Sequence, residues 1–341
     1  MLSISRTLAV FCLAGASLAQ AAVGLTEVPG LPGENPVTVY YPSGSPMRLV
    51  PRGKFQLELA VDGVPVRANG RLVVISHGSG GSPWVHANLA RRLVEAGFVV
   101  AMPLHKGDNY QDNGNPGPDS WSMRPAEVSH AIDAMAADAR FAPLLDTAKV
   151  GVYGFSAGGH TALSMAGGRW SPAGFMRHCE QNLADDFQSC VGLITQLSGG
   201  PLDGAKKWLA SWVIRSRFDD DRPREHHDPR VAAVVAGMPS AADFDLRSLE
   251  RPPVPLGLIN AAHDRWLVPR FHGERIAQAC QPCERIADLP SAGHGALLSP
   301  LPPGLTGLVG ELLNDPPGFD RAVLGDVDAK VSAFFTRHLL Q

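Results

Sequence analysis

The sequence has no marked excess of charge of either sign. Its 30 Lys and Arg residues stand against 33 Asp and Glu residues, which gives a formal net charge of −3. A chain without a basic surplus lacks the electrostatic footprint of a nucleic-acid-binding protein, and a chain without a polybasic run lacks an attachment to anionic membranes. No internal repeat is visible. Nucleic-acid and membrane partners are therefore not expected.

The sequence also lacks an apolar run long enough to span a bilayer. The run Thr7–Ala16 is too short, follows the single charge of Arg6, and precedes Ala19-Gln-Ala21, which has the A-x-A form of a cleavage site. Residues 1–21 are therefore predicted to be a signal peptide. The mature chain would begin at Ala22 and be exported, to the periplasm or outside the cell.

Cysteine is scarce. Of five cysteines, Cys12 lies in the predicted signal peptide, and an even number remains for an exported chain, which favours two disulfides. The spacing favours two short loops over crossed pairings. A redox or zinc role for the C-x-x-C pair is the alternative, but no second C-x-x-C accompanies it, so no metal or cofactor is expected. The predicted pairs are Cys179–Cys190 and Cys280–Cys283.

Strand and helix signals alternate along the 341 residues, which predicts one α/β domain over residues 22–341. An insertion at about 169–228 interrupts the alternation. It contains tryptophans, which indicates more than a solvated linker, and its acidic, histidine-containing end at 219–228 favours an exposed loop over a metal site. Helices are expected at Pro83–Ala96 and Pro125–Ala139, with a polar loop at 105–123 between the strand after the first helix and the second helix.

The most informative segment is Gly154-Phe155-Ser156-Ala157-Gly158, a G-x-S-x-G sequence. A β-prone run precedes it and a helix-compatible run follows it. A serine at such a sharp strand-to-helix turn stands exposed to a base, and the flanking glycines relieve the crowding of the turn. Ser156 is therefore the candidate nucleophile.

A serine nucleophile needs a base and an acid, which follow it in the order acid, then histidine. Asp264 comes after the apolar, strand-like run 253–259, and His294 stands between two glycines after the strand-like run 284–289. Both are expected on loops at the carboxyl ends of strands. Their alternatives are a helix-capping aspartate and a surface-loop histidine.

Acyl transfer also needs N–H donors for the oxyanion. The candidates are the backbone N–H of Ala157, next to the nucleophile, and that of Ser79, in the glycine-rich loop after the strand-like run 71–76. A phosphate-binding loop is the competing interpretation, but neither nucleotide-binding glycine pattern is completed. The histidines beside these elements, His77, His160 and His263, are expected to support the loops.

Together these blocks resemble the α/β-hydrolase superfamily, most closely its dienelactone-hydrolase-like and platelet-activating-factor-acetylhydrolase-like branch. The resemblance covers most of residues 37–300 with gaps and includes 73–81, 93–103, 124–128, 150–159 and 228–235. It implies the α/β-hydrolase fold, a mostly parallel central sheet with helices on both faces and the insertion as a cap, or else as an excursion packed away from the site. It places the triad on Ser156, Asp264 and His294, although some relatives take the acid from an earlier strand end, here Asp243 or Asp245.

The sequence therefore predicts an exported serine hydrolase that cleaves small-molecule carboxylic esters through an acyl-enzyme. Two alternatives stay open. The same triad could cleave amides, as in a peptidase or amidase, or the fold could be a catalytically silent binding protein.

Overall fold

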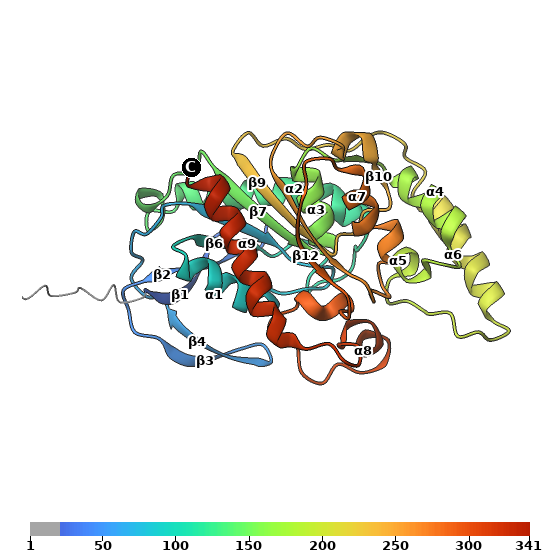
Figure 1. The fold of residues 1–341 in the computed structure, drawn as a ribbon, viewed down its shortest axis with the longest axis horizontal. Coiled ribbons are helices and arrows are strands. Elements are labelled where there is room, and N and C mark those ends of the chain that lie inside the picture. The colour runs from blue at the N-terminus through green and yellow to red at the C-terminus, as the bar shows by residue number, and fades with distance from the viewer. Residues whose placement is uncertain (1–20) are drawn as a thin grey trace, which may run out of the picture.

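A computed structural model describes residues 21–341, and a large mixed β-sheet forms its centre (Figure 1). The strands are β1 Ala22–Val28, β2 Val37–Ser43, β3 Arg48–Arg52, β4 Phe55–Val61, β5 Leu72–Ser76, β6 Val99–Pro103, β7 Val150–Phe155, β8 Arg169–Trp170, β9 Val231–Gly237, β10 Phe244–Asp245, β11 Leu256–Ala261 and β12 Glu284–Leu289.

Ten of the described strands pair in the order β12-β11-β9-β7-β5-β6-β2-β1-β4-β3, while β8 and β10 pair separately. All neighbours from β12 to β6 run parallel, and β2 pairs antiparallel with both β6 and β1. The carboxyl ends of the parallel strands therefore lie along one edge, where this type of sheet carries its sites.

The parallel strands are apolar throughout because both faces of the sheet are covered. Along β5, Leu72 and Val74 enter one core, and Val73 and Ile75 enter the other. The helices that cover these faces are α1 and α9 on one side and α2, α3 and α7 on the other, with α9 in red across the near face in Figure 1. The helix bounds are α1 Ala87–Glu95, α2 Pro118–Ala137, α3 Ala157–Met165, α4 Pro172–Asn182, α5 Phe187–Val191, α6 Asp203–Arg217, α7 Gly273–Ala279, α8 Gly307–Leu313 and α9 Leu324–Leu339.

The predicted α/β architecture is confirmed, but the predicted start of the second helix was wrong. Helix α2 begins at Pro118, seven residues before the predicted start at Pro125, so the end of the expected 105–123 loop is helical. Gly117, with φ 83°, provides the turn into the helix, and Pro118 occupies a first-turn position that needs no N–H partner. The predicted helix at 83–96 is a 3₁₀ turn, Pro83–His86, followed by α1.

The insertion follows α3 and contains β8, α4, α5 and α6. Its first part belongs to the core, since Trp170 and Phe175 are 3% and 6% exposed. The face of α6 that carries Trp208 and Trp212 does not, since these side chains are 69% and 60% exposed, and α6 lies at the outer end of the molecule (Figure 1).

Carboxylates at the acidic end of the insertion, 219–228, form ion pairs with arginines. Asp220 pairs with Arg222 and Arg224, and Asp228 pairs with Arg230. Asp228 is buried, which corrects the expectation of a wholly exposed loop. These carboxylates do not converge as a metal-binding group in the part of the chain that the structure describes.

None of the helices within residues 21–341 is long and apolar enough to cross a membrane. The predicted signal peptide, apart from Ala21, lies outside the described residues.

Candidate active site

Ser156 lies at a strained turn between β7 and α3. Its φ of 58° and ψ of −116° fall in a region that non-glycine residues rarely adopt. The glycines on either side make the turn possible. A Cβ at Gly154 would lie 1.8 Å from the Gly158 carbonyl oxygen, and a Cβ at Gly158 would lie 1.9 Å from the Ser76 carbonyl oxygen. The turn therefore holds the serine at the carboxyl end of β7.

Two further strand ends bring a histidine and an aspartate to the serine. His294 follows β12, and its Nε2 lies 2.9 Å from Ser156 Oγ. Asp264 follows β11, and its Oδ2 lies 2.6 Å from Nδ1 of His294. Asp264 and His294 are buried, whereas Ser156 keeps partial exposure. The three side chains form one hydrogen-bonded chain across 138 residues of sequence.

The carboxylate of Asp264 is fixed by its own loop. Its Oδ1 accepts hydrogen bonds from the backbone N–H groups of Trp266 and Leu267, at 2.9 and 2.8 Å, which leaves Oδ2 for His294. This loop is consequently preorganised to hold the imidazole in one orientation.

The alternative acids lie elsewhere. Asp243 Oδ2 is 3.0 Å from Nε2 of His160, and Asp245 pairs with Arg169 and Arg247. Of the three aspartates considered from the sequence, Asp264 is the one that the structure places against His294.

Both oxyanion candidates lie beside the serine. Ala157 is the first residue of α3, and an ideal Cβ on Gly78 would be 3.3 Å from Ser156 Cβ, so the loop that carries Ser79 passes close to the nucleophile. The hydroxyl of Ser79 donates to Asp108 Oδ1, at 2.6 Å. The backbone N–H groups of Ser79 and Ala157 donate to no acceptor among the described residues, so both can bind a ligand.

Comparison with known proteins agrees with the fold. Residues 60–174 match the model of the dienelactone hydrolase family. A solved structure of a ferulic acid esterase from Streptomyces cinnamoneus superposes with a TM-score of 0.59 at 16% sequence identity, covering 95% of this chain and 92% of that one. The chain has the α/β-hydrolase fold. The match to part of the chain supports a carboxylic-ester hydrolase. The search of curated proteins found no match.

The matched segment covers only part of the hydrolase site. It contains Ser156, Ala157 and Ser79 but ends before Asp264 and His294. The acid and the base are therefore placed by the geometry of the chain itself.

The hydrolase contains a second Ser-His-acid chain that the sequence analysis missed. Ser76 Oγ is 2.7 Å from Nε2 of His105, whose Nδ1 is 2.5 Å from Glu127 Oε2. Burial lowers the pKa of His105 well below its usual value and raises the pKa of Glu127. Ser76 and His105 are 0% exposed, so no substrate carbonyl can reach this hydroxyl in the folded hydrolase.

The three support histidines differ in their surroundings. His77 is buried, and its Nδ1 donates to the Gly78 carbonyl oxygen at 2.7 Å, while its Nε2 accepts from the His105 N–H. His160 pairs with Asp243. The ring of His263 is exposed and has no hydrogen-bond partner within the described residues, so nothing supports its predicted role.

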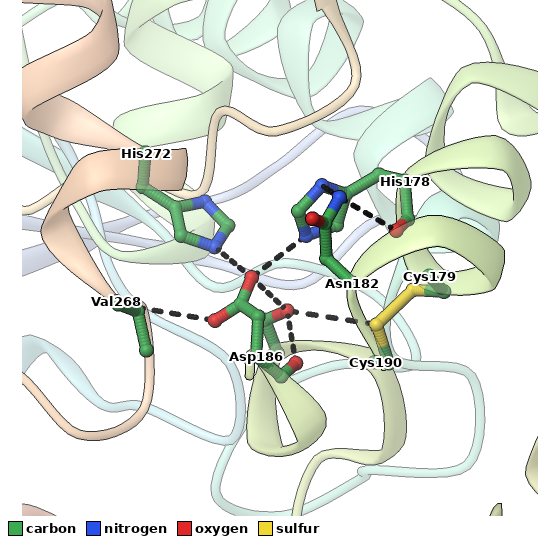
Figure 2. The surroundings of a disulfide bond; sticks show 8 residues. His178, Cys179, Asn182, Asp186, Cys190, Val268 and His272 are labelled. Atoms are coloured by element: carbon green, nitrogen blue, oxygen red, sulfur yellow. Dashed lines mark hydrogen bonds and ion pairs between the residues drawn. A yellow bond between two sulfur atoms is a disulfide. The ribbon is translucent and has the colours of Figure 1, made fainter. Parts of the chain in front are cut away.

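One buried cluster, His178, Asp186 and His272, has the composition of a metal site (Figure 2). Nε2 of each histidine lies within hydrogen-bond distance of Asp186 Oδ2, at 2.7 and 2.9 Å. Nδ1 of His272 accepts from the Ala241 N–H at 3.0 Å, so a neutral ring carries its proton on Nε2 and donates it to the carboxylate. That tautomer does not fit a metal ligated through Nε2.

The cluster connects the insertion to the loop of Asp264. Asp186 also accepts from the backbone N–H of Val268 at 3.2 Å, four residues after Asp264 (Figure 2). Burial raises the pKa of Asp186, but the hydrogen bonds from His178, His272 and Ser189 outweigh it and hold this pKa well below its usual value. An ionised Asp186 thus anchors the acid loop to the insertion.

The two disulfides are those that the spacing favoured, Cys179–Cys190 and Cys280–Cys283. The first encloses Asp186. Replacing both Cys179 and Cys190 with serine should loosen the insertion by about 2–3 kcal/mol, because the bridged loop is short. Limited proteolysis should then cut faster between residues 179 and 202, with a modest loss of ester turnover.

The double serine variant of Cys280 and Cys283 is the matched control, because this bridge lies between α7 and β12 and not in the insertion. Equal proteolysis of the insertion in the wild type and the first variant would contradict the anchoring role of the Cys179–Cys190 bridge.

Proposed function

We propose that the chain is an exported serine hydrolase that cleaves carboxylic esters of small molecules through Ser156, His294 and Asp264. The single observation that carries this proposal is the hydrogen-bonded chain of these side chains at the carboxyl ends of β7, β11 and β12. The proposed export depends on the sequence of residues 1–21 alone.

The mechanism follows from the geometry. His294 Nε2 takes the proton of Ser156 Oγ as the oxygen attacks the ester carbonyl, and the N–H groups of Ala157 and Ser79 bind the oxyanion. Collapse breaks the bond to the leaving alkoxide, which takes the proton from His294. Water, deprotonated by the same imidazole, then attacks the acyl-enzyme. Collapse breaks the bond to Ser156 Oγ, which takes the proton back from His294 as the carboxylic acid leaves. Asp264 keeps the Nδ1 proton of His294 in place and stabilises the imidazolium.

The walls beside the base are apolar. The rings of Phe155 and Trp266 lie 5.1 and 5.3 Å from the His294 imidazole, measured between centroids. They shield the imidazole from bulk water on these sides. Shielding strengthens the charge–dipole interactions on which this mechanism depends.

The test is turnover of p-nitrophenyl esters of increasing acyl length, alongside matched p-nitroanilides and labelling with a fluorophosphonate. Ester turnover and labelling of Ser156 support the proposal, and the chain-length series defines the substrate class. Faster anilide than ester cleavage would favour the amidase. Absence of both turnover and labelling would favour a silent fold.

Ester turnover should have an acidic limb, because the general base must be unprotonated to accept the serine proton. The rate of fluorophosphonate labelling should show the same acidic limb, since it uses the same proton transfer. A flat profile of both rates, measured where chemistry limits turnover, would contradict His294 as the base.

A further inference from the structure

The loop that carries the Ser79 N–H is held by a buried ion pair on its far side. Asp108 lies in the loop after β6, Arg124 lies on α2, and both side chains are 0% exposed. Arg124 Nη2 is 2.7 Å from Asp108 Oδ2. The mechanism above uses neither residue.

The carboxylate of Asp108 holds the tip of the loop. Its Oδ1 accepts two hydrogen bonds, from Ser79 Oγ at 2.6 Å and from the Gly80 N–H at 2.9 Å. Burial raises the pKa of Asp108, but the charge of Arg124 and these hydrogen bonds more than offset it, so the pKa lies below its usual value. The acceptor is therefore a charged group, which makes both bonds strong.

The guanidinium of Arg124 holds the base of the loop. Its Nη1 donates to the His77 carbonyl oxygen at 2.6 Å, its Nη2 also reaches the Asp108 carbonyl oxygen at 3.1 Å, and its Nε donates to Ser120 Oγ at 2.8 Å. The ion pair thus fixes His77, Ser79 and Gly80. Gly78, which lies between them in the sequence, packs against Ser156.

Stability alone is a weak reason to bury such a pair. The free energy lost when two charges leave water is about as large as the free energy gained from their attraction. Apolar side chains of similar volume often stabilise the folded state equally well. A fixed loop has a clear use here, because an oxyanion donor must point at the position that the developing charge will occupy.

We propose that Asp108, together with Arg124, is a positioning residue that aims the Ser79 N–H at the oxyanion formed on Ser156. The inference rests on the proposed esterase function. Asp108 touches no reacting atom, so its effect should appear in the transition state and leave substrate binding nearly unchanged.

The test compares Asp108→Asn with wild type in three measurements: kcat and KM for p-nitrophenyl acetate, the affinity of phenylboronic acid, and the melting temperature. Phenylboronic acid adds to a serine oxygen as a tetrahedral anion and so probes the oxyanion position. We expect kcat to fall about 10- to 100-fold, less than the 10²–10³ lost when a donor is removed outright. KM should stay within about threefold, and boronate affinity should fall in parallel with kcat/KM.

Asp228→Asn is the matched control. Asp228 is a buried carboxylate that pairs with Arg230 just before β9, at the end of the sheet opposite Ser156. This variant should lose stability and keep kcat/KM and boronate affinity. The inference is overturned if Asp108→Asn behaves as this control does, or if its kcat falls while boronate affinity is unchanged.

If Asp108→Asn does not accumulate as folded protein, the Ser79→Ala variant tests the inference in its place. It removes one hydrogen bond to Asp108 without leaving a buried charge unpaired. We expect a several-fold loss of kcat/KM and of boronate affinity with little change in melting temperature, and unchanged kcat/KM would overturn the inference. A wild-type protein without ester turnover would instead overturn the proposed function, so the two failures are distinguishable.

Discussion

Replacing Ser156 with alanine is expected to abolish ester turnover and fluorophosphonate labelling while the chain folds normally. The loss should be on the order of a millionfold, because without the oxygen no acyl-enzyme can form. Alanine should fit the strained turn at least as well as serine does, since it is smaller and keeps the same backbone. Mass spectrometry of the labelled protein and the thermal unfolding curve test both statements.

The structure offers a matched control in Ser76, which has its own histidine and acid but is completely buried. Ser76→Ala should reduce stability, because it leaves His105 Nε2 without its partner, and it should retain the label on Ser156. Labelling that survives in Ser156→Ala and disappears in Ser76→Ala would exchange the roles of the two serines.

The second large effect is expected from Asp264→Asn. Asparagine keeps the shape and can still accept from the Trp266 and Leu267 N–H groups, but it removes the charge opposite His294 and no longer fixes the productive tautomer. Turnover should fall by about 10³–10⁴-fold with little change in the unfolding temperature. Steady-state kinetics and circular dichroism measure these two effects.

Asp243→Asn serves as its control, because Asp243 faces His160 and not His294. It should keep turnover within about tenfold of wild type, a loss far smaller than that from removing the charge of a triad. An inactive Asp243→Asn beside a nearly wild-type Asp264→Asn would move the acid to the earlier strand end.

The sequence was sufficient for the parts of the site that local patterns specify. Ser156 is indicated by glycines two residues away on either side. His294 stands between two glycines after the strand-like run 284–289, and Asp264 follows an apolar run bounded by prolines. Strands buried on both faces have such runs, and the loops that follow them carry the functional groups.

The supporting contacts were not predictable in the same way. Arg124 belongs to one of the resembling blocks, but nothing in its neighbourhood indicates that it meets Asp108, which lies in a polar loop 16 residues earlier. Asp186 likewise meets Val268 and His272 over more than 80 residues. Such pairings depend on how the elements pack, and a local pattern does not contain that information.

The order of the site along the chain has a consequence for folding. The nucleophile turn is complete by residue 165, but its base arrives only after β12, at the edge of the sheet and late in the sequence. Parallel strands pair through long connections, and such non-local contacts form slowly. A partly folded chain therefore carries an inert serine, and the return of esterase activity during refolding reports the docking of the last strand.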